Sequence, residues 1–283
     1  MDGVTTTRVL ITGVRGKTGT PLAGLLAARG VEVRGGSSEP ARVDLYGVVP
    51  TAFDWDDPAG WARALDGVDA VFVVRPDRPD APALVADLAA VTAPGTRLVL
   101  LSERAADHPA LEGWSLGSEQ AVRDAGRPCV VLRPSWFMQV LSDDRFYRDD
   151  VVDRGELPFA DGGADVAWID ARDIAAVAER ALLDPDLDGR VLEITGPEAL
   201  SFPEVARRLA AALGRPVEHR SLTVEEALAT SDGFDRHLLE VTLRRVHDGT
   251  FSLVTGTVEE VTGRPARSLE EFLAEDADAL RRG

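Results

Sequence analysis

The chain has 283 residues, a formal net charge of −17 and one cysteine. This length is sufficient to bury a full hydrophobic core, and it allows one large domain or a main domain with a smaller lobe. The negative charge argues against a nucleic-acid partner, because binding nucleic acid needs a basic face. The charge is compatible with a cationic small molecule as well as with solubility alone.

The sequence has no N-terminal signal pattern and no apolar run near the length of a membrane span, so no membrane partner is expected. Cys129 has no second cysteine with which to form an internal disulfide. The apolar run 129–132 favours a buried, inert thiol over a nucleophile. These features predict a protein of the reducing cytoplasm.

Residues 7–29 have the pattern of a strand, a glycine-rich turn and a helix. The turn contains Gly13, Gly16 and Gly19 with the spacing G-x-x-G-x-x-G. Gly13 is expected to permit the tight turn, Gly16 to let a diphosphate approach the backbone, and Gly19 to let the helix pack closely on its strand. The helix N-terminus would offer N–H groups and a positive dipole end to the phosphates. A second strand at 31–34 completes a βαβ unit, so we predict a dinucleotide site; the alternative is a glycine-rich turn without a ligand.

The second strand is followed by Gly35, Gly36, Ser37 and Ser38, where the adenosine ribose is expected. An NAD enzyme usually carries Asp or Glu at that point to hold the 2′-hydroxyl. Small hydroxyl residues, with Arg15 nearby and Lys17 assisting, favour a 2′-phosphate instead. NADP is therefore the predicted coenzyme, and Glu39 and Asp44 keep NAD as the alternative.

The rest of the chain alternates strands and helices at short spacing. Strands are predicted at 46–53, 70–74, 96–101, 129–132, 166–169 and 190–195, and helices at 59–65, 82–91, 111–125, 174–183 and 201–213. This alternation predicts an α/β fold, a doubly wound parallel sheet of the Rossmann type, with a smaller, mostly helical C-terminal substrate lobe. The predicted division is a dinucleotide-binding core at 1–138, to which 166–196 returns, and a substrate lobe at 139–165 and 197–283.

Several polar residues fall at the carboxyl ends of these strands, where ligands of open α/β sheets bind. Asp54 would accept a hydrogen bond from an adenine amino group and Trp55 would flank the ring; the alternative is an acidic turn that caps the next helix. The full set of predicted coenzyme contacts is Gly13, Arg15, Gly16, Lys17, Thr18, Gly19, Ser37, Ser38, Asp54, Trp55, Arg75, Pro76, Ser102 and Pro134.

Lysine and tyrosine counts limit the chemistry. Lys17 is the only lysine, and Tyr46 and Tyr147 are the only tyrosines, so a Tyr-x-x-x-Lys catalytic pair cannot be built. The candidate catalytic residues are Ser102, Trp136 and Tyr147. Ser102 would hydrogen-bond the nicotinamide or the substrate, or else only cap its strand. Trp136 would wall in the nicotinamide, or else belong to the core of the lobe, and Tyr147 would donate a proton. No Cys, His and Asp cluster has metal-ligand spacing, and we predict no metal.

Five segments together resemble one known family, the NmrA-like atypical short-chain dehydrogenases, and within it the ergot-alkaloid reductases of the agroclavine and festuclavine dehydrogenase type. They are Thr12-Gly13-x-x-Gly16-Lys17-Thr18-Gly19, Phe53-Asp54-Trp55, Leu132-Arg133-Pro134-Ser135-Trp136-Phe137-Met138, Asp170-x-x-Asp173-Ile174-Ala175 and Val261-Thr262-Gly263-Arg264-Pro265. The resemblance implies a Rossmann core, a C-terminal substrate lobe, and NAD(P)H as reductant or sensed ligand. Two positions depart from the family pattern, with Ser38 where an arginine often follows strand two and Ser115 where a Lys or His is frequent.

An iminium accepts hydride and becomes a neutral amine, whereas a ketone needs a proton on its developing alkoxide. A site without a Tyr-Lys pair therefore favours a C=N⁺ bond or a conjugated acceptor protonated by solvent. We predict an NAD(P)-dependent oxidoreductase acting on an imine, an iminium or an enone- or quinone-like small molecule, cationic or aromatic, in specialised metabolism. The alternatives are a non-catalytic NAD(P) sensor of the NmrA kind and a non-redox cyclase or isomerase on the same fold.

Overall fold

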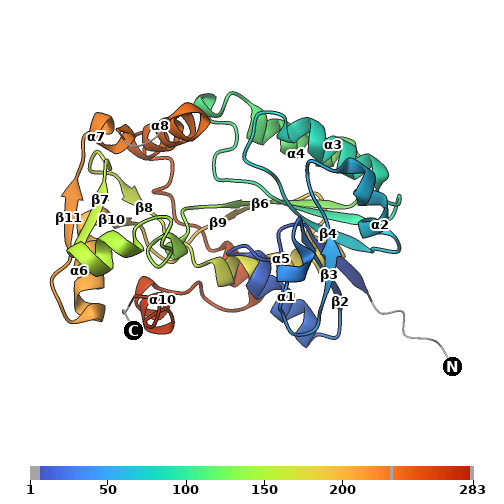
Figure 1. The fold of residues 1–283 in the computed structure, drawn as a ribbon, viewed down its shortest axis with the longest axis horizontal. Coiled ribbons are helices and arrows are strands. Elements are labelled where there is room, and N and C mark those ends of the chain that lie inside the picture. The colour runs from blue at the N-terminus through green and yellow to red at the C-terminus, as the bar shows by residue number, and fades with distance from the viewer. Residues whose placement is uncertain (1–6, 230–231, 281–283) are drawn as a thin grey trace. The chain divides into compact units, whose positions relative to one another are not determined.

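The computed structural model describes residues 7–229 and 232–280 (Figure 1). Contacts divide the chain into two compact units. The first comprises Met1–Asp107, Glu112–Pro134 and Ala171–Glu193, and the second comprises His108–Leu111, Ser135–Asp170 and Ile194–Gly283. Each unit has its own hydrophobic core, so each is described separately.

The first unit is built on a seven-stranded sheet with the order β3-β2-β1-β4-β5-β6-β9. Its strands are β1 (Arg8–Ile11), β2 (Glu32–Ser37), β3 (Val48–Ala52), β4 (Ala70–Val74), β5 (Arg97–Leu101), β6 (Cys129–Pro134) and β9 (Val191–Ile194). All neighbouring pairs from β3 to β6 are parallel. The predicted doubly wound sheet of the Rossmann type is confirmed.

Helices lie on both faces of this sheet: α1 packs against α5, and α3 packs against α4 (Figure 1). The helices are α1 (Gly19–Ala28), α2 (Trp61–Leu65), α3 (Ala81–Val91), α4 (Trp114–Asp124) and α5 (Ala171–Leu183), with short 3₁₀ turns at Pro40–Arg42 and Pro58–Gly60. Val9, Leu10 and Ile11 on β1 are fully buried, as expected for an apolar strand covered on both faces.

Some boundaries differ from the prediction for local reasons. The helix predicted from residue 111 begins at Trp114 because Glu112 and Gly113 both have positive φ, which a right-handed helix cannot accommodate. The strand predicted from residue 46 begins at Val48, and the Tyr46 side chain is fully exposed.

The second unit combines helices with two small two-stranded sheets. The strands β7 (Glu156–Phe159) and β11 (Glu218–Ser221) pair in parallel, and β8 (Asp165–Val166) pairs with β10 (Leu200–Ser201) in antiparallel fashion. The helices are α6 (Phe202–Leu213), α7 (Val224–Leu228), α8 (Gly233–His247), α9 (Thr257–Thr262) and α10 (Leu269–Glu275).

The unit boundaries lie a few residues from the predicted ones. The first unit ends at Pro134 rather than at 138, and the returning segment begins at Ala171 rather than at 166. The cause is packing: Met138 and Trp168 are both buried in the core of the second unit.

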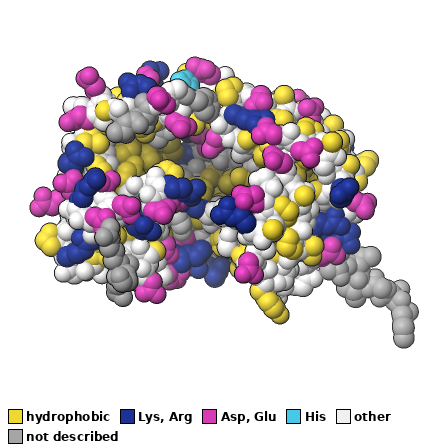
Figure 2. All heavy atoms as spheres, viewed as in Figure 1, with side chains coloured by type: hydrophobic (Ala, Val, Ile, Leu, Met, Phe, Trp, Pro, Cys, Tyr) yellow, Lys and Arg dark blue, Asp and Glu magenta, His cyan; other side chains and the backbone are white. Residues whose placement is uncertain are grey.

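On the face drawn in Figure 2, carboxylates are interspersed with arginines. No helix among the described residues is both long and apolar enough to span a bilayer.

Candidate coenzyme site

The glycine turn between β1 and α1 is shaped by close packing. A Cβ atom on Gly19 would lie 2.1 Å from the Gly13 carbonyl oxygen, and one on Gly13 would lie 3.1 Å from Val74 Cβ. The predicted close packing of helix on strand through Gly19 is confirmed. The structure adds a packing reason for Gly13: a side chain there would crowd Val74, whereas none of the three motif glycines has a positive φ, so close approach and not a left-handed backbone favours glycine.

Polar groups in this turn lack partners within the described residues. The Thr18 hydroxyl oxygen is buried and makes no hydrogen bond, although Thr18 occupies the N-cap position of α1. The Arg15 and Thr18 backbone N–H groups make no backbone hydrogen bond there either. Because buried polar groups are normally paired, an orphaned hydroxyl beside N–H groups without backbone partners indicates a ligand position, and a diphosphate fits it. The residues present therefore fit a dinucleotide.

Next to the turn, a cavity of ≈ 430 Å³ opens at the carboxyl ends of β2 and β3. Its lining residues are Ser37, Ser38, Ala52, Phe53, Asp54, Asp57, Ala59, Gly60 and Arg63. The predicted contacts Ser37, Ser38 and Asp54 are thus brought together. The Asp54 carboxylate accepts a hydrogen bond from the Asp56 N–H at 2.9 Å, so it closes a local turn and does not cap a helix.

Trp55 directly follows two of the lining residues, Phe53 and Asp54, and its side chain is held in place. Its indole N–H donates to the Val74 carbonyl at 3.2 Å, and its ring packs edge-on against Phe53 and Trp61, with centroids 5.2 and 5.6 Å away. These contacts fix the ring at the end of β4. Trp55 does not line the cavity itself, and its predicted contact with an adenine ring stays a prediction.

Arg15, predicted to bind a 2′-phosphate, lies 3.8 Å from the Glu39 carboxylate. The Arg42 guanidinium donates to both oxygens of the same carboxylate at 3.1 Å. Glu39 is thus shared by two arginines at the exposed rim of the turn. Lys17 and Gly16 lie in the same turn, and their coenzyme contacts stay predictions.

At the end of β4, Arg75 is buried and largely neutralised. Its guanidinium donates to Glu103 at 2.5 Å and to the Ser115 hydroxyl at 3.2 Å, and it lies 4.3 Å above the Trp114 ring. Only its Nε has no partner within the described residues. Pro76 follows it. Ser115, at the position where the family often has Lys or His, donates to Glu103 at 2.5 Å.

At the end of β5, Ser102 is part of a second buried network. Its hydroxyl donates to Glu119 at 2.8 Å, and Glu119, with a side chain 0% exposed, also accepts from Arg133 at 2.7 Å and from Arg123 at 3.0 Å. The hydrogen bond to Glu119 raises the pKa of the Arg133 guanidinium. Because the Ser102 proton is used inside this network, its hydroxyl remains available to a ligand only as an acceptor. Pro134, the last residue of β6, accepts from the Arg104 N–H at 3.0 Å.

The other two predicted catalytic residues lie in the second unit. Trp136 packs among Phe159, Trp168, Phe202 and Phe251, with ring centroids 5.2 to 6.3 Å away. This arrangement supports the core alternative for Trp136. Tyr147 packs edge-on against Phe159 at 6.2 Å. Burial, and then the nearby Asp150 carboxylate, raise the pKa of the Tyr147 phenol.

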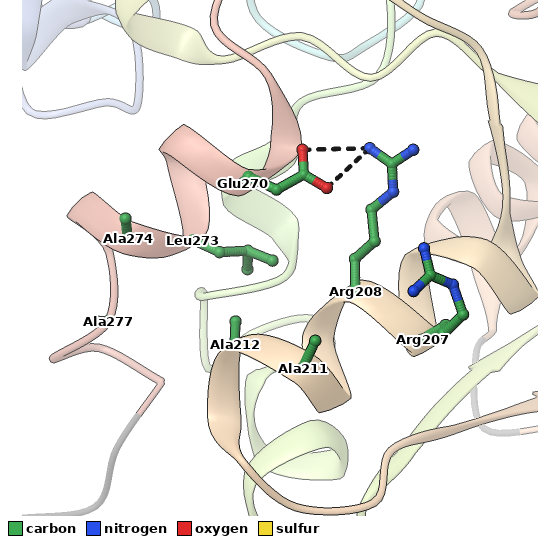
Figure 3. Close-up of a pocket in the computed structure, with 8 residues that line it drawn as sticks. All are labelled: Arg207, Arg208, Ala211, Ala212, Glu270, Leu273, Ala274 and Ala277. Carbon is green, nitrogen blue, oxygen red and sulfur yellow. Dashed lines mark hydrogen bonds and ion pairs between the residues drawn. The ribbon is translucent and has the colours of Figure 1, made fainter.

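The second unit also contains a groove of ≈ 510 Å³ between α6 and α10. Half of its lining residues are alanines, and Arg208 pairs across it with Glu270 (Figure 3). Arg208 also contacts Glu198 and Glu204. None of the predicted site residues lines this groove.

A model of the NmrA-like family matches residues 5–273. The chain belongs to the NmrA-like family. It is 37% identical to a (4-alkanoyl-5-oxo-2,5-dihydrofuran-3-yl)methyl phosphate reductase of Streptomyces griseus and 35% identical to an NAD(P)H azoreductase of Xenophilus azovorans, each match covering 96% of this chain and 99% of the relative.

The predicted relationship to the ergot-alkaloid reductases is also confirmed. The chain is 31% identical to festuclavine synthase II of Penicillium roqueforti, over 93% of this chain and 96% of that protein. Among solved structures, an NADPH-dependent quinone oxidoreductase of Escherichia coli has the same fold, with a TM-score of 0.81 at 21% identity over 94% of this chain and 99% of that one.

Sequence reasoning missed Arg63, Glu103 and Glu119. Arg63 belongs to no motif, and only the cavity that it lines reveals it. Glu119 carried a weak signal, since Arg123 follows it at the i,i+4 spacing of a helical ion pair.

Proposed function

We propose that the chain is an NAD(P)H-dependent reductase of a small-molecule imine, iminium or conjugated acceptor of the enone or quinone type, acting in specialised metabolism. NADP(H) is the coenzyme, with NAD(H) as the alternative. Two relatives support this reading by name, since one is an NAD(P)H azoreductase and another a festuclavine synthase. The substrate is a small molecule, and a cationic or aromatic one is expected.

The glycine turn supports the coenzyme. The chain's own groups there are the Arg15 and Thr18 N–H groups, the buried Thr18 hydroxyl and the positive end of the α1 dipole, all of which favour a diphosphate. When bound, the coenzyme supplies a hydride. The residues of the turn hold its phosphates.

The observation that carries the acceptor class is the position of Lys17. It is the only lysine of the chain and it lies in the glycine turn, so no lysine can lower the pKa of a catalytic tyrosine. Tyr147 lacks the lysine partner of such a pair, and burial raises the pKa of its phenol, which makes it a weaker acid than an activated catalytic tyrosine. An acceptor that needs no strong general acid is therefore favoured.

Two acceptor types satisfy this condition. In an iminium, hydride forms a C–H bond, the C=N π electrons become the nitrogen lone pair, and the product is a neutral amine without proton transfer. In an enone or quinone, hydride adds to carbon, the electron pair moves to the carbonyl oxygen, and water supplies the proton. With both acceptor types, the protein contributes mainly by holding the acceptor against the coenzyme and by excluding side reactions.

Single-turnover reduction tests the proposal. Purified protein is mixed with NADPH or NADH and then with a cyclic iminium, a quinone or a simple ketone, and loss of the nicotinamide absorbance at ~340 nm is followed. We expect turnover with the iminium or the quinone. Turnover with the ketone should be at least ~100-fold slower, because the site has no activated acid to protonate the alkoxide. Coenzyme binding without turnover of any acceptor would indicate a sensor, and product formation without a change in absorbance would indicate a cyclase or isomerase.

A further inference from the structure

We propose that Arg63 is the residue that selects NADPH over NADH, by receiving the 2′-phosphate in the cavity that it shares with Ser37 and Ser38. This inference rests on the proposed function and deepens it. It moves the selecting charge from the rim of the glycine turn to helix α2, which follows β3.

The first argument is the position of the cavity. Ser37 is the last residue of β2, and Phe53 and Asp54 directly follow β3, so the cavity lies where the adenosine half of a dinucleotide meets a Rossmann sheet. The Ser37 hydroxyl accepts from the Glu39 N–H at 3.1 Å, which leaves its own proton to donate. Ser38 is exposed beside it.

The second argument compares Arg63 with Arg15 and Arg42, which follow the neighbouring strands β1 and β2. Arg15 and Arg42 both contact Glu39, and Arg42 does so through hydrogen bonds to both carboxylate oxygens. A phosphate would have to compete with that carboxylate for either of them. Arg63 lines the cavity and makes no hydrogen bond or ion pair with any residue that the structure describes. Its planar fork can bind a phosphate with two parallel hydrogen bonds.

The third argument is the charge of the cavity without Arg63. Asp54 and Asp57 line it, so the remaining side chains carry two negative charges and no positive one. A phosphate dianion would be repelled, whereas the 2′-hydroxyl of NAD would not. Arg63 is therefore the group that makes a 2′-phosphate acceptable in this cavity.

The test measures binding, independently of catalysis. Dissociation constants of NADPH, NADH, 2′,5′-ADP and 5′-AMP are determined by calorimetry at low salt for the wild type, Arg63→Gln, Arg15→Gln and Arg42→Gln. We expect Arg63→Gln to weaken NADPH and 2′,5′-ADP about tenfold to a hundredfold, as for loss of a charged hydrogen bond, and to leave NADH and 5′-AMP within about twofold. Arg42→Gln, whose partner Glu39 lies outside the cavity lining, is the matched control, and urea unfolding checks each fold.

Three outcomes would overturn the inference. Arg15→Gln alone could produce the selective loss, Arg63→Gln could weaken all four ligands equally, or the wild type could bind NADH as tightly as NADPH. Each leaves the proposed function intact, because a coenzyme still binds. If the wild type binds neither coenzyme, the proposed reductase function fails as well. Failure of the Arg63 inference alone is therefore distinguishable from failure of the proposed function.

Discussion

Two polar regions at the carboxyl end of the same sheet are built in opposite ways. In the Glu119 network, defined by Ser102, Glu119, Arg123 and Arg133, the buried carboxylate has three donors within 3.0 Å. In the glycine turn, the buried Thr18 hydroxyl has no partner within the described residues. Both regions contain residues that sequence reasoning assigns to the coenzyme, yet only the second leaves a buried hydroxyl without any partner among the described residues.

The difference separates stability from function. A saturated buried network holds its elements together, and removing one member leaves the others charged and unpaired. A buried polar group without a protein partner reduces stability and can gain a partner from a bound ligand. For a polar residue at a strand end, the hydrogen bonds that it already makes therefore distinguish a structural role from a ligand-binding role better than its position in the fold does.

The largest effect is expected in the saturated region. Glu119→Ala should lower the free energy of unfolding by about 3–5 kcal/mol, because Arg123 and Arg133 lose a buried carboxylate partner. The matched control is Glu240→Ala, which removes an exposed ion pair with Arg244 at 3.7 Å and should cost at most about 1 kcal/mol. Urea unfolding measures both. Equal losses in the two variants would refute the structural role given to Glu119.

A second prediction addresses the glycine turn. In Gly19→Ala the new Cβ would lie 2.1 Å from the Gly13 carbonyl oxygen, so the turn must open and its N–H groups must move. We expect the NADPH dissociation constant to rise at least about tenfold, since that opening disturbs every phosphate contact. Fluorescence titration of the coenzyme provides the measurement.

Helix α1 provides the control for this variant. Gly24 lies in the same helix with nothing within 4 Å of its Cβ position. Gly24→Ala should raise stability by about 0.5–1 kcal/mol, because alanine loses less entropy in a helix, and should leave coenzyme affinity unchanged. The idea fails if Gly19→Ala binds NADPH as tightly as Gly24→Ala.

The sequence was sufficient for the fold and for the glycine turn because both depend on local periodicity. Alternating apolar strands and helices define a parallel sheet, and Gly19 is recognisable from its spacing alone. Side-chain pairing was not accessible in this way. That Ser102 donates to Glu119, 17 residues away, or that Arg75 lies over Trp114, depends on how strand ends and helix starts meet.

The same limit explains Arg63 and Trp136. Arg63 lines a cavity formed by two strand ends and a helix, and no spacing marks it. For Trp136 the sequence left two readings open, and the aromatic neighbours supplied by β7, α6 and distant loops support the packing one. Aromatic side chains bury large areas, so composition alone cannot separate a site wall from a core.

The smallest effect is expected at Tyr147, a partly buried side chain that packs against the core of the second unit. Burial raises its pKa above the unfolded value of about 10, so its contribution to stability is fully present below that pH. As the pH rises from there towards the folded pKa, the unfolded chain releases the proton first and the contribution is lost. Tyr147→Phe should therefore change stability little at pH 7 and show a shallower loss above about pH 10. Urea midpoints of the two proteins between about pH 8 and 11 measure the difference, and parallel curves would show that the phenol does not titrate differently in the fold.

With a quinone acceptor at pH 7, a lower kcat for Tyr147→Phe would support the predicted role of Tyr147 as proton donor. Reduction of an iminium should be unaffected, because that reaction needs no proton.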